Sequence, residues 1–243
     1  PMFHPNYGKA EWYTDRELRN LQAHYAAEVT LVDKQIGRVL RMIKDTGIWE
    51  DTMIVFTTDH GMYLGEHNYT GKSNINTRDD RGNWCYLDEI VHTPLIVKPA
   101  GGRKTAESHH LVQPVDNFAS ILDAFGVSLE GLKIDGRSYL PLLNGQDVPV
   151  REMAFSASIL AVNDQPPSWT TINDGEWTLC FGGRPEDENQ LFHTASDPQQ
   201  LKNVWAEERG QADRLYQGFV EFLKSIGTSE ERMAEYSKVY AKA

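Results

Sequence analysis

The sequence lacks the features of several large classes of protein. It has only two cysteines, Cys85 and Cys180, which are far apart and match no metal-ligand spacing, so we expect no disulfide framework. It has no apolar run of membrane-spanning length and no signal-peptide pattern. Acidic residues outnumber basic ones by 35 to 24. The net charge of −11 argues against nucleic acid or an anionic membrane as a partner, because both require a cationic surface.

The chain also lacks an initiator methionine, because it starts at Pro1, and its opening residues read as a loop. We therefore expect it to be the later part of a longer protein. The compartment stays open, since either a cytoplasmic or an exported protein is compatible with this sequence. Its 243 residues, 40% of them hydrophobic, are enough to build a substantial core.

Residues 1–145 show the pattern of a layered α/β domain. Thr14 to Glu17 form a capping box, and the apolar residues that follow at helical spacing predict a long amphipathic helix that ends at Gly47. The apolar runs 53–57 and 94–97 predict strands that are covered on both faces. Asp116 is expected to cap a further helix, which runs through Phe125. A long helix followed by a buried strand is typical of a βα-type layered sheet.

Residues 146–243 differ from the first part in local composition and hydropathy pattern, and they predict a smaller α+β subdomain. Short stretches rich in β-branched and aromatic residues indicate antiparallel strands, and Asn173-Asp174-Gly175 is a hairpin signal. Apolar residues recur at helical spacing near the end of the chain, and they predict a terminal helix packed on the small sheet. These residues are Leu215, Phe219, Phe222, Leu223 and Ile226.

The first predicted strand ends in a group of ionisable residues. Asp59 and His60 follow it directly, at the place where ligands gather in layered sheets. A carboxylate and an imidazole on adjacent residues can both ligate one divalent cation. The alternative is structural: Asp59 would cap the turn and His60 would bond to the backbone.

The residues that follow carry a resemblance to a known family. Asp59-His60-Gly61, then Leu64 to His67, then Lys72 resemble the C-terminal half of the sulfatase family in the alkaline phosphatase superfamily. Further segments resemble that family in the right order, among them "HTPLIVKPAGG", "QPVDNFASILDAFGV" and "NQLFHTASDPQQLKNV". The resemblance implies an alkaline phosphatase-like sheet, here partial, with the smaller C-terminal subdomain beside it.

The resemblance also implies site roles. Asp59 and His60 would be the second pair of protein ligands on one active-site metal. Lys72 would reach an oxygen of the bound sulfate and offset charge that builds in the transition state. His67 would line the substrate pocket as a second catalytic residue. The implied metal is Ca²⁺ first, with Mn²⁺ or Zn²⁺ as alternatives because His60 adds a nitrogen ligand.

The family's nucleophile is missing from the matched region. That residue is a formylglycine made from a Cys or Ser in Cys/Ser-x-Pro/Ala-x-Arg, and it lies upstream together with the first two metal aspartates. Cys180 is followed by Arg184 at the same spacing, but Gly182 replaces the proline or alanine and the order along the chain is wrong, so we interpret it as coincidence. Cys85 is expected to be an ordinary buried or loop thiol.

Candidate contacts to the substrate lie in the polar insertion after Lys72. Arg78, Arg81 or Trp84 would contact the leaving group, with a solvated loop as the alternative. The expected substrate is a small-molecule or sugar sulfate ester.

These residues predict a metal-dependent sulfuric ester hydrolase of which this chain carries half of the active site. Alone it would be inactive, and it would need either the N-terminal part of the same enzyme or self-association. One alternative is a phosphodiesterase or phosphonate monoester hydrolase, because relatives with Asp-His include both sulfatases and phosphonate monoester hydrolases. The other alternative is a folded fragment without catalysis.

Overall fold

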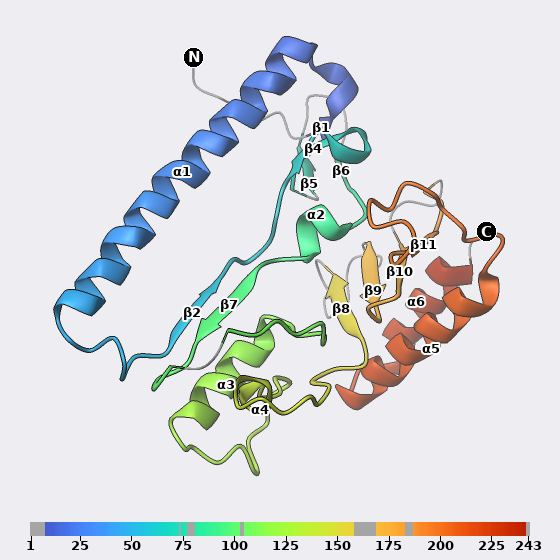
Figure 1. Cartoon of the computed structure of the whole chain (residues 1–243). Helices are drawn as coiled ribbons and strands as arrows, with labels where there is room; N and C mark the ends of the chain where they lie inside the picture. The colour runs from blue at the N-terminus through green and yellow to red at the C-terminus, as the bar shows by residue number, and fades with distance from the viewer. Residues whose placement is uncertain are drawn as a thin grey trace.

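The fold was analysed in a computed structural model, which describes residues 8–72, 74–76, 81–102, 105–157, 169–182 and 187–241. Helices and short strands are interspersed in the first part, and antiparallel strands with two helices form the last part (Figure 1). The helical elements are η1 (Ala10–Trp12), α1 (Asp15–Asp45), η2 (Glu66–Asn68), α2 (Asp88–Val91), α3 (Val115–Ala124), α4 (Leu140–Leu143), α5 (Arg209–Ser225) and α6 (Glu230–Ala241). The strands are β1 (Gly8–Lys9), β2 (Ile54–Thr57), β3 (Tyr63–Leu64), β4 (Tyr69–Gly71), β5 (Asn74–Asn76), β6 (Arg81–Asn83), β7 (Leu95–Lys98), β8 (Ala154–Ala157), β9 (Thr170–Asn173), β10 (Trp177–Phe181) and β11 (Gln190–His193).

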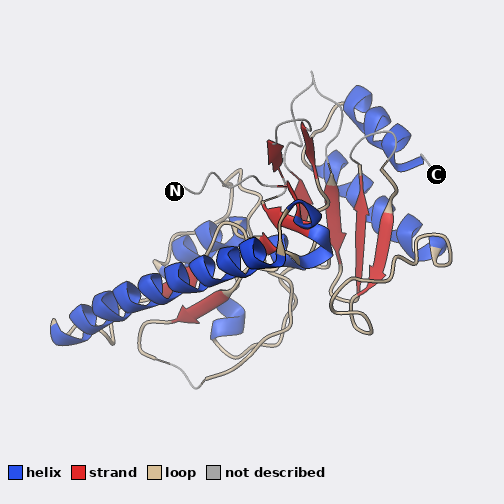
Figure 2. Cartoon of the chain, turned by 90° about the horizontal axis from the view of Figure 1, so that it is seen from above, coloured by secondary structure: helices blue, strands red, loops and turns tan. Residues whose placement is uncertain are grey.

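Helix α1 begins and ends where its sequence predicts. The Thr14 hydroxyl accepts from the Glu17 backbone N–H at 3.3 Å, and the Glu17 carboxylate accepts from the Thr14 N–H at 2.8 Å. These two bonds complete the capping box. The helix runs as one long rod along one side of the molecule to Asp45, and Gly47 follows in the left-handed region (Figures 1 and 2). Among the helices within the described ranges, none combines the length and the apolarity needed to cross a bilayer.

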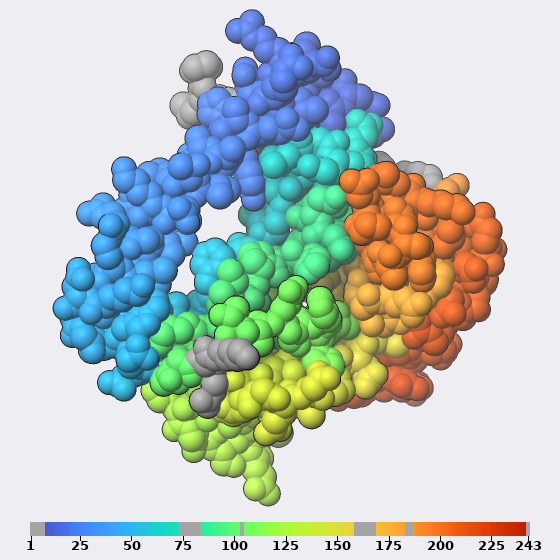
Figure 3. All heavy atoms as spheres, viewed as in Figure 1, coloured from blue at the N-terminus to red at the C-terminus, as the bar shows by residue number. Residues whose placement is uncertain are grey.

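The apolar stripe of α1 is exposed. No residue of α1 is buried, and Val29, Val32 and Val39, which share one face of the helix, are each about half exposed. In the space-filling view an opening remains between α1, in blue, and the segment that carries β2 (Figure 3). The periodicity that predicts a core-facing helix is therefore present, but no described element covers that face.

Strands β2 and β7 form an antiparallel two-stranded sheet with the register Val55↔Val97 and Phe56↔Ile96. Both strands lie where the apolar runs predict them. The expected cover on both faces is not found among the described residues, because Phe56 is exposed and Ile96 is 64% exposed. The faces of such a sheet are covered by packed helices, and no described element covers these two side chains.

Helix α3 forms, but Asp116 does not cap it as expected. The N-cap is Pro114, and Asp116 lies in the first turn with its side chain fully buried. Its carboxylate accepts from the Gln113 and Arg137 backbone N–H groups at 2.8 and 2.7 Å and forms an ion pair with Arg151. Asp116 therefore joins α3 to two later segments, a role that local spacing does not predict.

The C-terminal part contains the predicted antiparallel sheet, in the order β11-β10-β9-β8. The hairpin at residues 173–175 is confirmed: Asp174 Oδ1 accepts from the Trp177 N–H at 2.7 Å, and Gly175 has a φ of 92°. Two helices, α5 and α6, follow the sheet in place of the single predicted helix (Figure 1). The core between them is made of buried apolar side chains: Ile172, Leu179, Phe181, Leu191, Ala212, Leu215, Tyr216, Phe219, Leu223, Tyr236 and Tyr240. The domain boundary at residue 145 stays a prediction.

A second core cluster joins the two parts of the chain. It combines Tyr63 and the segment 84–90 of the first part with Trp169, Cys180 and Phe192 of the second. The Thr171 hydroxyl donates to the Tyr86 carbonyl at 2.8 Å, which adds a polar link inside this cluster. Because α2 belongs to this buried segment, its position is fixed by the C-terminal sheet.

Candidate active site

The turn after β2 places Asp59 in the solvent. Its side chain is 82% exposed, and Oδ1 accepts from the His60 backbone N–H at 3.0 Å. The pKa of the Asp59 carboxyl lies below its ordinary value, first because of that N–H and then because the His60 ring lies beside it. Asp59 is therefore an accessible anion at the end of the strand.

His60 is held so that one ring nitrogen faces Asp59. Nδ1 lies 2.8 Å from the Gly61 carbonyl oxygen, and Nε2 lies 3.5 Å from Asp59 Oδ2. Because a carbonyl only accepts, Nδ1 carries the proton, and in the neutral ring Nε2 keeps a lone pair. Histidine ligands of metals commonly donate their other N–H to a backbone carbonyl in this way.

Both interpretations of this turn thus have support in its geometry. The hydrogen bonds that the structural alternative requires are present, from the His60 backbone N–H to Asp59 and from His60 Nδ1 to the Gly61 carbonyl. They leave Asp59 Oδ2 and His60 Nε2 facing each other, so that one oxygen and one nitrogen could act as metal ligands. Within the described ranges, no group of three or more His, Cys, Asp or Glu side chains could hold a metal ion. Asp59 and His60 therefore fit part of a cation site. Two ligands do not complete it, because such sites usually collect more.

His67 lies in a tight turn that is constrained on several sides. Its φ is 52° and that of Asn68 is 64°, both in the left-handed region, and Gly65 precedes them with a φ of 125°. The Asn68 side-chain oxygen accepts from the Glu11 N–H at 2.8 Å, which fixes this turn to η1. His67 itself is only 11% exposed, and its Nε2 lies 3.3 Å from Glu89 Oε1. The turn therefore presents a nearly buried imidazole.

Lys72 follows β4 and is exposed. The described contacts do not join it to Asp59, His60 or His67. Arg78 lies outside the described residues, and Arg81 lies in β6. The structure thus brings Asp59 and His60 together, and it leaves the expected roles of Lys72, Arg78 and Arg81 as predictions.

Trp84 does not lie in a solvated loop. Its side chain is 4% exposed and stacks on Tyr69, with 4.3 Å between ring centroids and 23° between planes. Its indole N–H has no hydrogen-bond partner in the structure as described. This burial favours a packing role over contact with a leaving group.

The two cysteines are both buried and free. Burial, reinforced by the neighbouring Cys180, raises the pKa of the Cys85 thiol well above its ordinary value. Cys180 lies in the centre of β10, with its sulfur 3.4 Å from the Thr171 hydroxyl. A buried thiol of this kind is inert, in keeping with the interpretation that its spacing to Arg184 is a coincidence.

A contact between the Asp59–Gly61 turn and α2 was not predicted from the sequence. The Gly61 N–H donates to the Ile90 carbonyl at 2.8 Å, and a Cβ on Gly61 would lie 1.9 Å from the Glu89 carbonyl oxygen. A side chain at this position would collide with the α2 backbone. The sequence does not mark Glu89 as a site residue, because its partners, His67 and Gly61, are 22 and 28 residues away along the chain.

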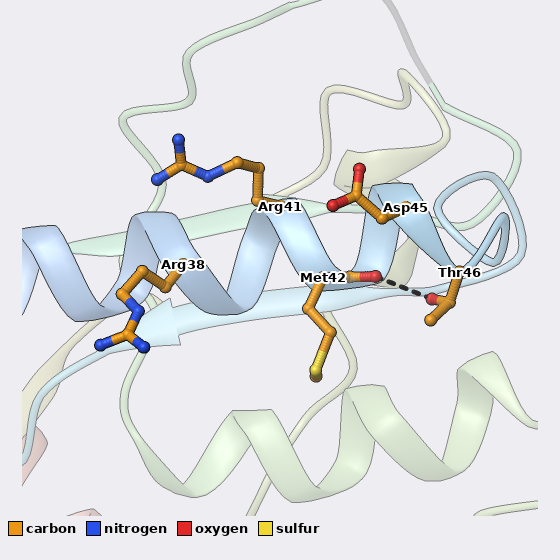
Figure 4. A pocket seen from close by; sticks show the side chains of 5 residues that line it. All are labelled: Arg38, Arg41, Met42, Asp45 and Thr46. Atoms are coloured by element: carbon orange, nitrogen blue, oxygen red, sulfur yellow. Dashed lines mark hydrogen bonds between the residues drawn. The ribbon is translucent and has the colours of Figure 1, made fainter.

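A hollow on the surface lies away from these residues. It is lined by residues at the C-terminal end of α1: Arg38, Arg41, Met42, Asp45 and Thr46. Figure 4 shows the two arginine side chains diverging, while Met42 points toward the neighbouring helix. None of the described candidate site residues lines this hollow.

Comparison with known proteins gives the family. The model of the family described as Sulfatase matches residues 2–127. The chain belongs to the sulfatase family. A multifunctional alkaline phosphatase superfamily protein, PehA of Trinickia caryophylli, is 30% identical to this sulfatase chain over 84% of the chain and 40% of PehA. A choline-sulfatase of Rhizobium meliloti (strain 1021) is 28% identical over 83% of the chain and 36% of that protein.

The fold agrees with this assignment. The crystal structure of a phosphonate monoester hydrolase of Agrobacterium radiobacter superposes with a TM-score of 0.62 at 25% identity, covering 92% of the sulfatase chain and 43% of the hydrolase. The expected alkaline phosphatase-like fold is confirmed. The chain spans about two fifths of the length of these proteins.

Proposed function

We propose that this chain forms part of a metal-dependent sulfatase that hydrolyses sulfate monoesters, and that Asp59, His60 and Lys72 are its share of the active site. Membership of the sulfatase family supports the reaction class. The observation that carries the proposal is the pair formed by Asp59 Oδ2 and His60 Nε2, with the other His60 nitrogen tied to the Gly61 carbonyl.

Asp59 and His60 would hold one divalent cation. The accessible carboxylate is a hard oxygen donor, which favours Ca²⁺, and the imidazole keeps Mn²⁺ and Zn²⁺ as alternatives. When bound, the cation would supply Lewis-acid stabilisation of negative charge on the sulfate. Two donors are too few for a tight site, so the remaining ligands and the formylglycine nucleophile would come from a segment outside this chain.

Lys72 would stabilise charge on the sulfate as the ester bond breaks. It lies one residue beyond β4, and its ammonium group is exposed and has no described partner that would compete with an anionic substrate. His67 would line the pocket beside it, on the turn that precedes the same strand. Because the chain has a net charge of −11, its overall field repels an anionic ester. A local cation such as Lys72 is therefore needed to bind the ester.

The apolar stripe of α1 and the β2–β7 pair would receive the missing half of the enzyme. The exposed valines of α1 and the exposed Ile96 of β7 are typical of a surface that is covered in the native assembly. The opening in Figure 3 lies between these two elements. A preceding segment that inserts there would both cover the apolar side chains and bring its own metal ligands toward Asp59.

The first experiment joins this chain to the segment that precedes it in the natural reading frame and measures hydrolysis of an aryl sulfate. In that enzyme we expect Lys72→Ala to lower kcat/KM by about 10²–10³-fold, the loss usual when one preorganised charge is removed. Lys224→Ala is a matched control, because it removes an exposed lysine from the end of α5 and should leave turnover unchanged. Undiminished turnover in the Lys72 variant would contradict the role proposed for it.

The same enzyme separates the rival functions. The ratio of its rates on aryl sulfate and aryl phosphonate esters decides between a sulfatase and a phosphonate monoester hydrolase. His60 and the likeness to the Agrobacterium radiobacter enzyme are the reasons to measure both substrates. A natural reading frame that begins at Pro1 would favour the third candidate, a folded domain without catalysis.

A further inference from the structure

Glu89 contacts two parts of the candidate site, the side chain of His67 and the Asp59–Gly61 turn, although no spacing in the sequence marks it. It belongs to the short helix α2, and its side chain is 25% exposed. Its Oε1 lies 3.3 Å from His67 Nε2. Its other oxygen, Oε2, is buried and has no hydrogen-bond partner in the described structure. Among the described side chains, that of His67 is therefore the hydrogen-bond partner of this carboxylate.

The same residue contacts the Asp59–Gly61 turn through its backbone. Gly61 packs so closely on the Glu89 carbonyl that no side chain fits between them, and the Gly61 N–H bonds to Ile90, the next residue of α2. Glu89 thus touches the turn of the proposed metal ligands with its main chain and His67 with its side chain. Glu89 therefore links those two functional groups.

His67 also contacts a fixed neighbour, Tyr63. Its ring meets the edge of Tyr63, with 6.1 Å between centroids and 75° between planes. Tyr63 is fully buried, and its hydroxyl donates to the Cys85 carbonyl at 2.9 Å and accepts from the Leu87 N–H at 3.1 Å. Because the backbone of His67 is also held in the left-handed region, the imidazole has few alternative positions.

We propose that Glu89 is a positioning residue that fixes the orientation and the tautomer of His67. An ionised carboxylate only accepts, so its contact with Nε2 places the proton on that nitrogen. Nδ1, for which the described residues provide no partner, is then the nitrogen that a substrate meets. The same division of labour, a carboxylate behind an imidazole, orients the general base in hydrolytic triads. The inference rests on the proposed function for its consequence in catalysis, but the orientation itself does not depend on it.

The orientation can be tested on the 243-residue chain by NMR of the imidazole nitrogens at alkaline pH, where the ring is neutral. We expect Nε2 of His67 to carry the proton in the unmodified chain. Glu89→Gln should weaken this preference, because an amide can either accept from an N–H or donate to a bare nitrogen. A His67 ring protonated on Nδ1, or a spectrum unchanged by Glu89→Gln, would overturn the proposal.

A matched control exists in the C-terminal subdomain. His193 Nε2 lies 3.2 Å from Glu176 Oε1, a contact of the same type between the end of β11 and the residue before β10. Glu176→Gln should change the His193 signals and leave those of His67 as they were. The His193 signals in the Glu89 variant also report whether that variant remains folded.

Kinetics of the joined enzyme test the consequence. We expect Glu89→Gln to lower kcat by about 10–100-fold, the usual effect of losing a group that orients a functional histidine, with KM changed less than about twofold. Glu89→Asp, which keeps the charge, should recover part of kcat, and Glu176→Gln should have no effect. Equal losses in Glu89→Asp and Glu89→Gln, or a change in KM alone, would show that the charge does not position His67. If the unmodified joined enzyme hydrolyses no ester, the proposed function fails, and the NMR experiment still decides the orientation.

Discussion

Gly61→Ala is the substitution that most directly tests how the site is held together. The added Cβ would lie 1.9 Å from the Glu89 carbonyl oxygen and 2.9 Å from its carbon. Non-bonded carbon and oxygen atoms approach to about 3.3 Å at best, so the turn or α2 must move by more than about 1 Å. Both neighbours are backbone atoms, and a side-chain rotation cannot relieve the collision.

The cost of Gly61→Ala follows from two losses. Overpacking of this kind costs about 1–3 kcal/mol of unfolding free energy. The Gly61 N–H also loses its 2.8 Å bond to Ile90, which contributes about 0.5–1.5 kcal/mol. We expect a destabilisation of roughly 2–4 kcal/mol, a large part of the ~5–15 kcal/mol of a typical domain.

Urea unfolding followed by circular dichroism measures this loss. Gly37→Ala is the matched control, because it adds the same methyl group inside α1, where a Cβ meets no atom within 4 Å. It should stabilise the chain by about 0.5–1 kcal/mol, since alanine loses less conformational freedom than glycine in a helix. An unfolding free energy for Gly61→Ala within about 0.5 kcal/mol of the unmodified chain would refute the close packing of the turn on α2.

Two further predictions concern the charged groups outside the site. Arg151→Met should lower the unfolding free energy by about 3–5 kcal/mol in urea, because it leaves the buried Asp116 carboxylate without its cation, and a loss below about 1 kcal/mol would contradict this. The Asp88 carboxylate, whose Oδ2 lies 3.6 Å from His92 Nδ1, raises the pKa of His92, so this pair stabilises the fold below about pH 6.5 and the contribution is lost as the pH rises through the raised pKa. His92→Gln should therefore cost less than about 1 kcal/mol at pH 5.5 and nothing at pH 8.5, since the His92 side chain is 80% exposed; an equal cost at both pH values would contradict the assignment.

The sequence predicts the elements whose signals are local. The capping box at Thr14, the glycine after α1 and the hairpin at residues 173–175 each depend on neighbours a few positions away, and all three are found. Asp59 and His60 belong to the same class, because a strand followed by two polar residues places them at its end.

Properties that depend on distant residues were not predictable in the same way. The cover of β2 and β7 depends on elements that pack on the faces of the sheet, and the apolar runs alone do not show whether such elements are present. Asp116 meets Arg151 35 residues later, and Glu89 meets His67 across 22 residues. Such contacts follow from the folded path of the chain, and neither hydropathy nor spacing reports them.

The order of elements in the C-terminal part has a consequence for how the chain is made. The apolar face of the sheet is complete once β11 has been synthesised as far as His193, but Tyr236 on α6, which packs against Phe181 of that face, comes roughly 43 residues later. At ~5–20 residues per second, part of that apolar face stays uncovered for roughly 2–9 s. During that interval the sheet is a target for chaperones and for aggregation, so the last two helices decide the yield of folded protein although they contribute no residue to the candidate site.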